Sequence, residues 1–145
     1  MDVRPHQRFS TRLALDAATI SAFAAAAGDA NPLHHDVGYA RGTRYGGIVA
    51  SGPQTSALLM GLAATHFSKV ADMVGLEFKF WFRAAVLADD PVELEWLVAA
   101  VRPTSKAATR VVELYGRLRT SRGATAVGAR GRVLVTDRPA LGAGS

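Results

Sequence analysis

Hydrophobic and polar residues alternate over most of the second half of the chain, which is the pattern of half-buried β-strands. The clearest case is residues 74–83 (VGLEFKFWFR), where the even-numbered apolar positions are predicted to share one face. Similar alternation runs through 92–101, 110–120 and 125–135, with short turn-forming segments between them. Consecutive strands with short turns predict an antiparallel meander. With an opening strand over 7–15, the chain should form a curved antiparallel sheet of about five strands.

Two segments of the first half are predicted to be helices. Residues 16–27 are rich in alanine, start at a good N-cap in Asp16 and end before Gly28. The apolar side of this helix would carry Ile20, Phe23 and Ala27. Residues 53–67 are apolar nearly all round, so we expect that helix to be buried on several sides. The fold class is therefore α+β, with one curved sheet around a long apolar central helix.

Length and composition fit one globular domain. The chain has 145 residues, 49% of them hydrophobic, and we assign 1–138 to a single domain and 139–145 to a flexible C-terminal tail. It has no cysteine, which excludes a disulfide framework, a thiolate zinc site and a cysteine nucleophile. No apolar stretch approaches the roughly 20 residues of a membrane span. We therefore expect a cytoplasmic protein without a membrane partner.

The net charge is +5, which raises the question of an acidic partner. Arginines are spread along the C-terminal half without a compact basic run or interleaved aromatic residues, so we predict no nucleic-acid partner. Basic charge also suits an anionic phosphorylated carrier. From charge alone, a solvated basic surface is the favoured interpretation.

The candidate chemistry lies in residues 28–34 (GDANPLH), between the two predicted helices. Asp29 and His34 could meet at one water molecule, polarise it and carry its proton. Asn31 is expected to shape the loop or orient Asp29, and Pro32 to fix its course. Considered alone, an Asp and a His in one loop more often cap a helix or bond to the backbone.

A longer pattern changes this weighting. Phe23 is followed by the 28–34 motif, then by Tyr39 and Ala40, and then by residues 46–52 (GGIVASG), which lead into the apolar helix. This pattern resembles the MaoC-like family of R-specific enoyl-CoA hydratases and dehydratases. The specific match covers residues 23–52, and the architecture agrees over most of the chain.

The resemblance implies a hotdog fold, in which a sheet wraps a central helix and two such units associate as a homodimer, with a higher oligomer left open. It implies that Asp29 and His34 hold a catalytic water, and that a main-chain N–H near Gly52 receives the thioester oxygen of a 2-enoyl-CoA. The positive end of a helix dipole suits a developing enolate. Coenzyme A would be part of the substrate, with no permanently bound cofactor.

Two serines mark departures from the family pattern. Ser51 stands where many members have a histidine before the glycine. Ser56 lies close to, but one position from, a serine that helps to bind the site. Ser51, Ser56 and Asn31 are therefore candidate substrate-contact residues, and acyl length and branching stay open. Further residues could line the entrance or contact the carrier's phosphates: Tyr39, Arg41, Arg44, Tyr45, Lys106 and Arg110.

Other functions remain as alternatives. A hotdog thioesterase would direct the same water at the carbonyl carbon, and a non-catalytic acyl-CoA-binding protein would keep the fold without turnover. A metal site made by His34 with His35, Asp36 or His66 is disfavoured, because adjacent residues of an extended segment point to opposite sides. A nucleophilic Ser51 is disfavoured by the lack of a Gly-x-Ser-x-Gly elbow. We therefore predict no metal.

Overall fold

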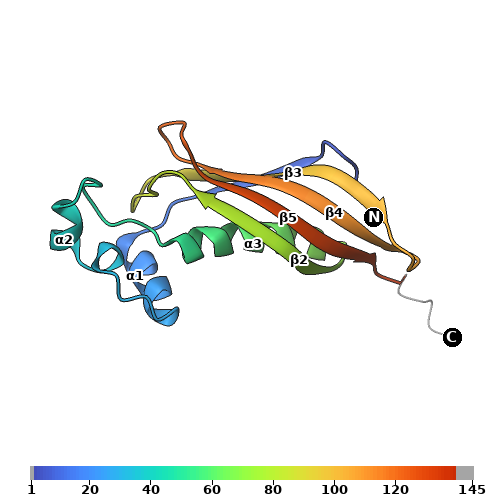
Figure 1. The fold of residues 1–145 in the computed structure, drawn as a ribbon, viewed down its shortest axis with the longest axis horizontal. Coiled ribbons are helices and arrows are strands. Elements are labelled where there is room, and N and C mark those ends of the chain that lie inside the picture. Colours follow the sequence, from blue (N-terminus) through green and yellow to red (C-terminus); the bar gives the residue numbers. More distant parts are fainter. Residues whose placement is uncertain (1, 140–145) are drawn as a thin grey trace.

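The computed structural model describes residues 2–139, so the predicted tail lies outside the described part of the chain apart from Pro139. Five antiparallel strands form one sheet in the order β1-β3-β4-β5-β2. Their bounds are β1 Arg8–Leu13, β2 Ala71–Phe82, β3 Val92–Pro103, β4 Thr109–Arg119 and β5 Thr125–Asp137. The sheet curves over one long helix (Figure 1). This confirms the predicted fold class.

The helices are α1 (Ala17–Ala26), a 3₁₀ turn (Pro32–His34), α2 (Val37–Arg41) and the central α3 (Gly52–Ser68). Asp16 caps α1 as predicted, because its carboxylate accepts a hydrogen bond from the Thr19 N–H. On the buried side of α1, Ile20 was predicted correctly, but Ala24 takes the place assigned to Ala27. In Figure 1, α1 and α2 lie beyond one end of the sheet, where α3 begins.

The predicted meander is correct for β3, β4 and β5 and wrong for β2. That strand pairs with β5, at the far edge of the sheet from β1. The segment from 83 to 91 is too long for a tight hairpin. Instead it crosses the end of the sheet, where Val86 is buried and Leu87 makes an isolated bridge to Val49. This crossing brings the segment beside the start of α3.

The predicted inner face of β2 is wrong in its first half. A bulge between Gly75 and Glu77 shifts the register, so the face presented to α3 changes from odd-numbered to even-numbered residues. Val74 and Leu76 are consequently 57% and 49% exposed. Phe78 and Phe80 pack against the core as predicted, whereas Phe82, at the end of the strand, is 57% exposed.

The central helix is buried on one side only, in contrast to the expectation. Its buried stripe is Thr55, Leu59, Ala63 and Phe67, spaced by four residues, with Gln54 beside it. On another side Met60 is 40% exposed. A single curved sheet covers only part of the helix, so an apolar composition does not bury the remainder.

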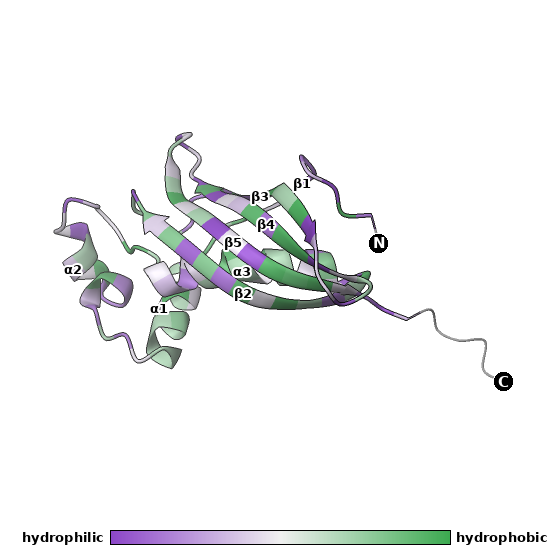
Figure 2. Cartoon of the chain, turned by 45° about the vertical axis from the view of Figure 1, so that its right-hand side comes forward, coloured by the Kyte–Doolittle hydropathy of each residue, from purple (hydrophilic) through white to green (hydrophobic). Residues whose placement is uncertain are grey.

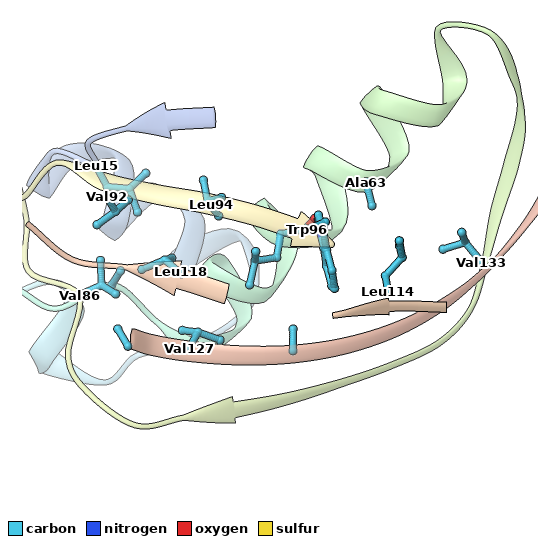
Figure 3. Close-up of a cluster of buried hydrophobic side chains, with 14 of the residues drawn as sticks. Leu15, Ala63, Val86, Val92, Leu94, Trp96, Leu114, Leu118, Val127 and Val133 are labelled. Atoms are coloured by element: carbon cyan, nitrogen blue, oxygen red, sulfur yellow. The ribbon is translucent and has the colours of Figure 1, made fainter. Parts of the chain in front are cut away.

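Trp96 joins the sheet to the central helix. Its ring lies over Gly116 of the neighbouring strand, where an added Cβ would come within 2.5 Å of the ring carbons. Its indole N–H donates to the Leu59 carbonyl of α3 at 2.7 Å. Figure 3 shows Trp96 and Leu114 between the strands and the helix segment that carries Ala63. The glycine is therefore required by close packing, because any side chain would displace the indole.

Cross-strand ion pairs occupy much of the outer face of the sheet, where Figure 2 shows hydrophilic positions on the strands. Glu95 contacts Arg8 at 2.9 Å and Arg117 at 3.1 Å, and Arg132 lies 3.5 Å from Glu77. Such exposed pairs contribute little stability. Several arginines are thus paired with carboxylates on this face, while the net charge of +5 remains. None of the helices within 2–139 is long and apolar enough to cross a membrane.

Candidate active site

The loop that carries Asp29 is shaped by the end of α1. Gly28 adopts φ +74°, a conformation that glycine reaches without strain, and it turns the chain back on the helix. The Asp29 N–H then donates to the Ala24 carbonyl at 2.8 Å. Side chains continue the turn, because the Asn31 N–H donates to Asp29 Oδ1 at 3.0 Å and the Leu33 N–H to Asn31 Oδ1 at 3.1 Å. Asn31 therefore shapes the loop, as the sequence suggested.

Asp29 and His34 lie close together, as the spacing of the motif allowed. Asp29 Oδ2 lies 3.4 Å from His34 Nε2. On the other side of the ring, His34 Nδ1 lies 2.6 Å from the Val49 carbonyl oxygen. The His34 side chain is 8% exposed and that of Asp29 is 31% exposed. The imidazole is thus held in the interior while the carboxylate reaches solvent.

Hydrogen-bond logic fixes the role of each His34 nitrogen. A carbonyl oxygen can only accept, so Nδ1 carries the proton in the contact with Val49. In the neutral ring Nε2 is then an acceptor that faces an acceptor carboxylate. The two atoms require a shared proton or a donor between them. One water molecule that donates a hydrogen to each would satisfy both.

The start of α3 lies beside this loop. Ser51 is the N-cap, its hydroxyl accepts from the Gln54 N–H at 3.2 Å, and the residue is 1% exposed. Its carbonyl accepts from the Thr55 N–H. The Gly52 N–H lies in the first turn of α3, so it has no hydrogen-bond acceptor within the helix. A Cβ at Gly52 would come 3.1 Å from the Phe82 ring, so this position is also sterically tight.

A cavity of about 480 Å³ opens at the start of α3. Gly52 and Thr55 form its helix wall, and Val86 and Val127 contribute apolar surface. The cavity is also lined by Leu33, which precedes His34 in the chain, and by Val49, whose carbonyl is bonded to His34 Nδ1. Asp29 and His34 do not line it. They therefore lie beside the cavity, with Val49 between them and it.

The remaining residues predicted to contact the substrate differ in whether they line this cavity. Ser51, Asn31 and Ser56 do not line the cavity. Arg44 and Tyr45 do, and Arg44 both bonds to the Tyr45 hydroxyl at 2.7 Å and lies over its ring. Arg83 lines the cavity too and was missed, because the alternating pattern placed it on the outer face of a strand. The nearest turn-forming residues, Asp89 to Pro91, come six or more positions later, so the local sequence did not signal that the strand ends at Phe82.

The histidines considered as metal ligands are separated. His66 stacks on Phe9 with ring centroids 3.7 Å apart, at the opposite end of α3 from His34. Across residues 2–139, no group of three His, Asp or Glu side chains is arranged to hold a metal ion.

Residues 3–116 match the family described as MaoC like domain. The chain belongs to this family. No curated protein matches it in sequence. The sheet wrapped around α3 is thus the hotdog fold that the MaoC-like resemblance implied.

Solved structures agree with this assignment. The (R)-hydratase from A. caviae involved in PHA biosynthesis is 27% identical, with 90% of this chain and 96% of that chain covered at a TM-score of 0.80. The MaoC-like dehydratase from Rhodospirillum rubrum is also 27% identical, with coverages of 94% and 95% and a TM-score of 0.80. R-hydratase PhaJ1 from Pseudomonas aeruginosa shares the fold at 21% identity, with coverages of 94% and 84% and a TM-score of 0.82.

Proposed function

We propose that this MaoC-like protein is a hydro-lyase that adds water to a 2-enoyl-CoA, or removes it from the (R)-3-hydroxyacyl-CoA. The observation that carries the proposal is the 3.4 Å distance between Asp29 Oδ2 and His34 Nε2. Both atoms are hydrogen-bond acceptors when the imidazole is neutral and Nδ1 donates to the Val49 carbonyl. A water that donates to both is polarised and aimed by two groups at once. Similarity to an (R)-hydratase and to a MaoC-like dehydratase supports this reaction class.

In the proposed hydration, the water oxygen attacks the third carbon of the acyl group while one member of the pair takes its proton. The electrons of the double bond move to the thioester oxygen, and an enolate forms. A proton then returns from the pair to the second carbon. Dehydration is the same sequence reversed, with the pair removing the proton from the second carbon and donating one to the leaving hydroxyl.

We propose the Gly52 N–H as the donor to the thioester oxygen. It lies at the positive end of the 17-residue helix α3 and borders the cavity. One preorganised donor of this type is worth roughly 3 to 4 kcal/mol in a transition state. Coenzyme A would enter only as part of the substrate, without a resident cofactor.

A homodimer belongs to the same proposal, with β2 as the contact edge. β2 lacks a partner strand on its outer side in the described sheet, and it exposes Val74 and Leu76. Beside it, a groove of about 260 Å³ between α3 and β2 is lined by Met60, Gly61, Ala64, Met73, Gly75 and Phe78. A second copy would pair with the strand and cover the exposed side of α3, which a single chain leaves bare.

The activity is tested by following both the conjugated-thioester absorbance and the release of free thiol on one set of enoyl-CoAs. Loss of the conjugated-thioester absorbance without release of free thiol is expected, whereas release of thiol would favour a thioesterase. Asp29→Asn and His34→Ala should each lower turnover by at least roughly a hundredfold while the protein stays folded. His66→Gln, at the other end of α3, serves as a folded histidine control. Wild-type turnover in both site variants would contradict the mechanism.

The dimer is tested separately by sedimentation. Leu76→Glu should shift the mass toward a single chain, because it places a charge in the proposed contact. Tyr115→Glu, which alters an equally exposed residue on the outer face of β4 (50% against 49% exposed), should leave the mass unchanged. A wild-type protein that sediments as one chain would remove the dimer without touching the chemistry.

A further inference from the structure

His35 follows the proposed catalytic histidine, yet its ring faces a different set of atoms. The two rings are inclined by 73° with centroids 6.5 Å apart. His35 Nε2 lies 2.7 Å from the main-chain carbonyl oxygen of Asp29, and His35 Nδ1 lies 2.6 Å from the hydroxyl of Ser21 on α1. The imidazole thus connects a helix to the backbone of the proposed catalytic carboxylate.

The direction of these bonds follows from the partners. The Asp29 carbonyl can only accept, so His35 Nε2 carries a proton, and in the neutral ring Nδ1 accepts from the Ser21 hydroxyl. His34 has the opposite arrangement, because its Nδ1 donates to the Val49 carbonyl. When both rings are neutral, the two adjacent histidines are therefore opposite tautomers. The unprotonated Nε2 of His34 faces Asp29 Oδ2, while the protonated Nε2 of His35 donates to the Asp29 carbonyl.

This contact completes the support around Asp29. Its N–H is bonded to Ala24, and its Oδ1 receives the Asn31 N–H, both through main-chain groups. Its carbonyl is the remaining backbone group, and His35 bonds to it from a partly buried position. Rotation of this peptide would swing the Asp29 side chain relative to the His34 ring. A displacement of 1 Å at such a site can cost on the order of a hundredfold in rate.

We propose that His35, oriented by Ser21, is a positioning residue that holds the Asp29 carboxylate at its working distance from His34. The inference rests on the proposed function, because it assigns a purpose to the separation of Asp29 Oδ2 and His34 Nε2. His35 does not contact the water or the substrate in this scheme. Its effect passes through the Asp29 peptide.

Kinetics at saturating substrate test the role. His35→Leu removes both hydrogen bonds and should lower kcat by roughly tenfold with KM nearly unchanged, since the acid-base geometry suffers and substrate contacts do not. His35→Gln keeps an N–H donor and should recover part of the loss. Ser21→Ala leaves the imidazole in place and should give a smaller decrease in kcat. His66→Leu is the matched control, because His66 is also partly buried and also packs against another ring.

The result expected is a kcat loss in His35→Leu, partial rescue in His35→Gln, and an unchanged kcat in His66→Leu even where the two leucine variants lose similar thermal stability. A His35→Leu enzyme with wild-type kcat, beside an inactive Asp29→Asn enzyme, would overturn the positioning role and leave the proposed function intact. If His35→Leu does not fold, Ser21→Ala decides, and a wild-type kcat there overturns the proposal.

A measurement without turnover separates the two claims. Two-bond ¹H–¹⁵N spectra at neutral pH should show His34 protonated at Nδ1 and His35 at Nε2, and His35→Gln should move the His34 ring signals. Such spectra would support the positioning even if the wild-type protein hydrated no substrate, in which case only the proposed function would fail. The same tautomer in both rings, or His34 signals unaffected by His35→Gln, would overturn the positioning.

Discussion

The ring of Phe9 lies parallel to that of His66 at the C-terminal end of α3, whereas the N-terminal end of the same helix borders a cavity of about 480 Å³. At the first end, Phe67 is 1% exposed and meets the Phe9 ring edge-on at 5.5 Å. At the second, Gly52 has no side chain, and irregular loops bring polar atoms to within hydrogen-bonding distance of one another. We call the C-terminal end closed because its rings pack on one another, although His66 and Phe67 also border a surface hollow of about 560 Å³. We call the N-terminal end open because its first turn faces a cavity without an intervening side chain at Gly52.

The difference follows from what each end of a helix offers. The first turn has N–H groups without intrahelical acceptors, so it can bind a partially negative atom if the neighbouring chain leaves room. Large side chains there would fill the room and remove the donor from reach. The closed end has no such requirement and can be packed for stability. Substitutions at the two ends should therefore separate folding from activity.

The largest effect is expected at the closed end. Phe67→Ala should lower the free energy of unfolding by about 3 to 5 kcal/mol, because it removes a fully buried ring and leaves a cavity among Phe9, His66 and the sheet. Denaturant titration measures this loss. The kcat per folded molecule should stay at the wild-type value. A large fall in kcat with little loss of stability would show that the two ends are not separable.

The next effect is expected at the open end. Gly52→Ala places a methyl group 3.1 Å from the Phe82 ring and beside the proposed donor, so kcat should fall by roughly tenfold through displacement of that donor. Gly47→Ala is the matched control, since a Cβ there meets nothing within 4 Å. Steady-state kinetics compare the two. Equal kcat in both variants would argue against a role for the Gly52 N–H.

The same division explains how much could be predicted from the sequence. Elements set by local composition were correct, including the Asp16 cap of α1 and the outward Glu and Arg positions of β3 and β4. The bulge in β2 could not be predicted. Val74 and Leu76 continue the alternating sequence pattern, although the backbone register shifts by one residue between Gly75 and Glu77. The position of β2 beside β5 was also missed. Strand order depends on long-range pairing, which periodicity does not encode.

The motif at 28–34 predicted the meeting of Asp29 and His34 because five residues of a tight turn cannot separate them far. The Val49 carbonyl and the Arg83 side chain come from distant segments, and nothing in their local sequence marks them. The same holds for Ser21, which looks like an ordinary helix residue until α1 is placed beside His35. Short-range chemistry was therefore predictable, and the supporting contacts required the fold.

A smaller effect should distinguish the two ends through their serines. Ser51→Ala removes the N-cap acceptor for the Gln54 N–H and should cost about 1 kcal/mol of unfolding free energy. It should also lower kcat, because the first turn carries the proposed donor. Ser68→Ala removes only an exposed hydroxyl bond to the Thr65 carbonyl at the other end. Thermal denaturation and kinetics on both variants should show a change in activity for Ser51→Ala alone.

The smallest expected effect is a pH dependence of stability at the closed end. Burial, assisted by the nearby Lys69 charge, holds the pKa of His66 below its ordinary value. The unfolded chain then binds this proton more readily than the native chain, so stability rises with pH. The contribution should be fully present above about pH 6.5 and should be lost as pH falls below that value. His66→Gln removes the titrating group. The difference in melting temperature between pH 8 and pH 5 should therefore be smaller in the variant than in the wild type, and an unchanged difference would assign the pH dependence to other groups.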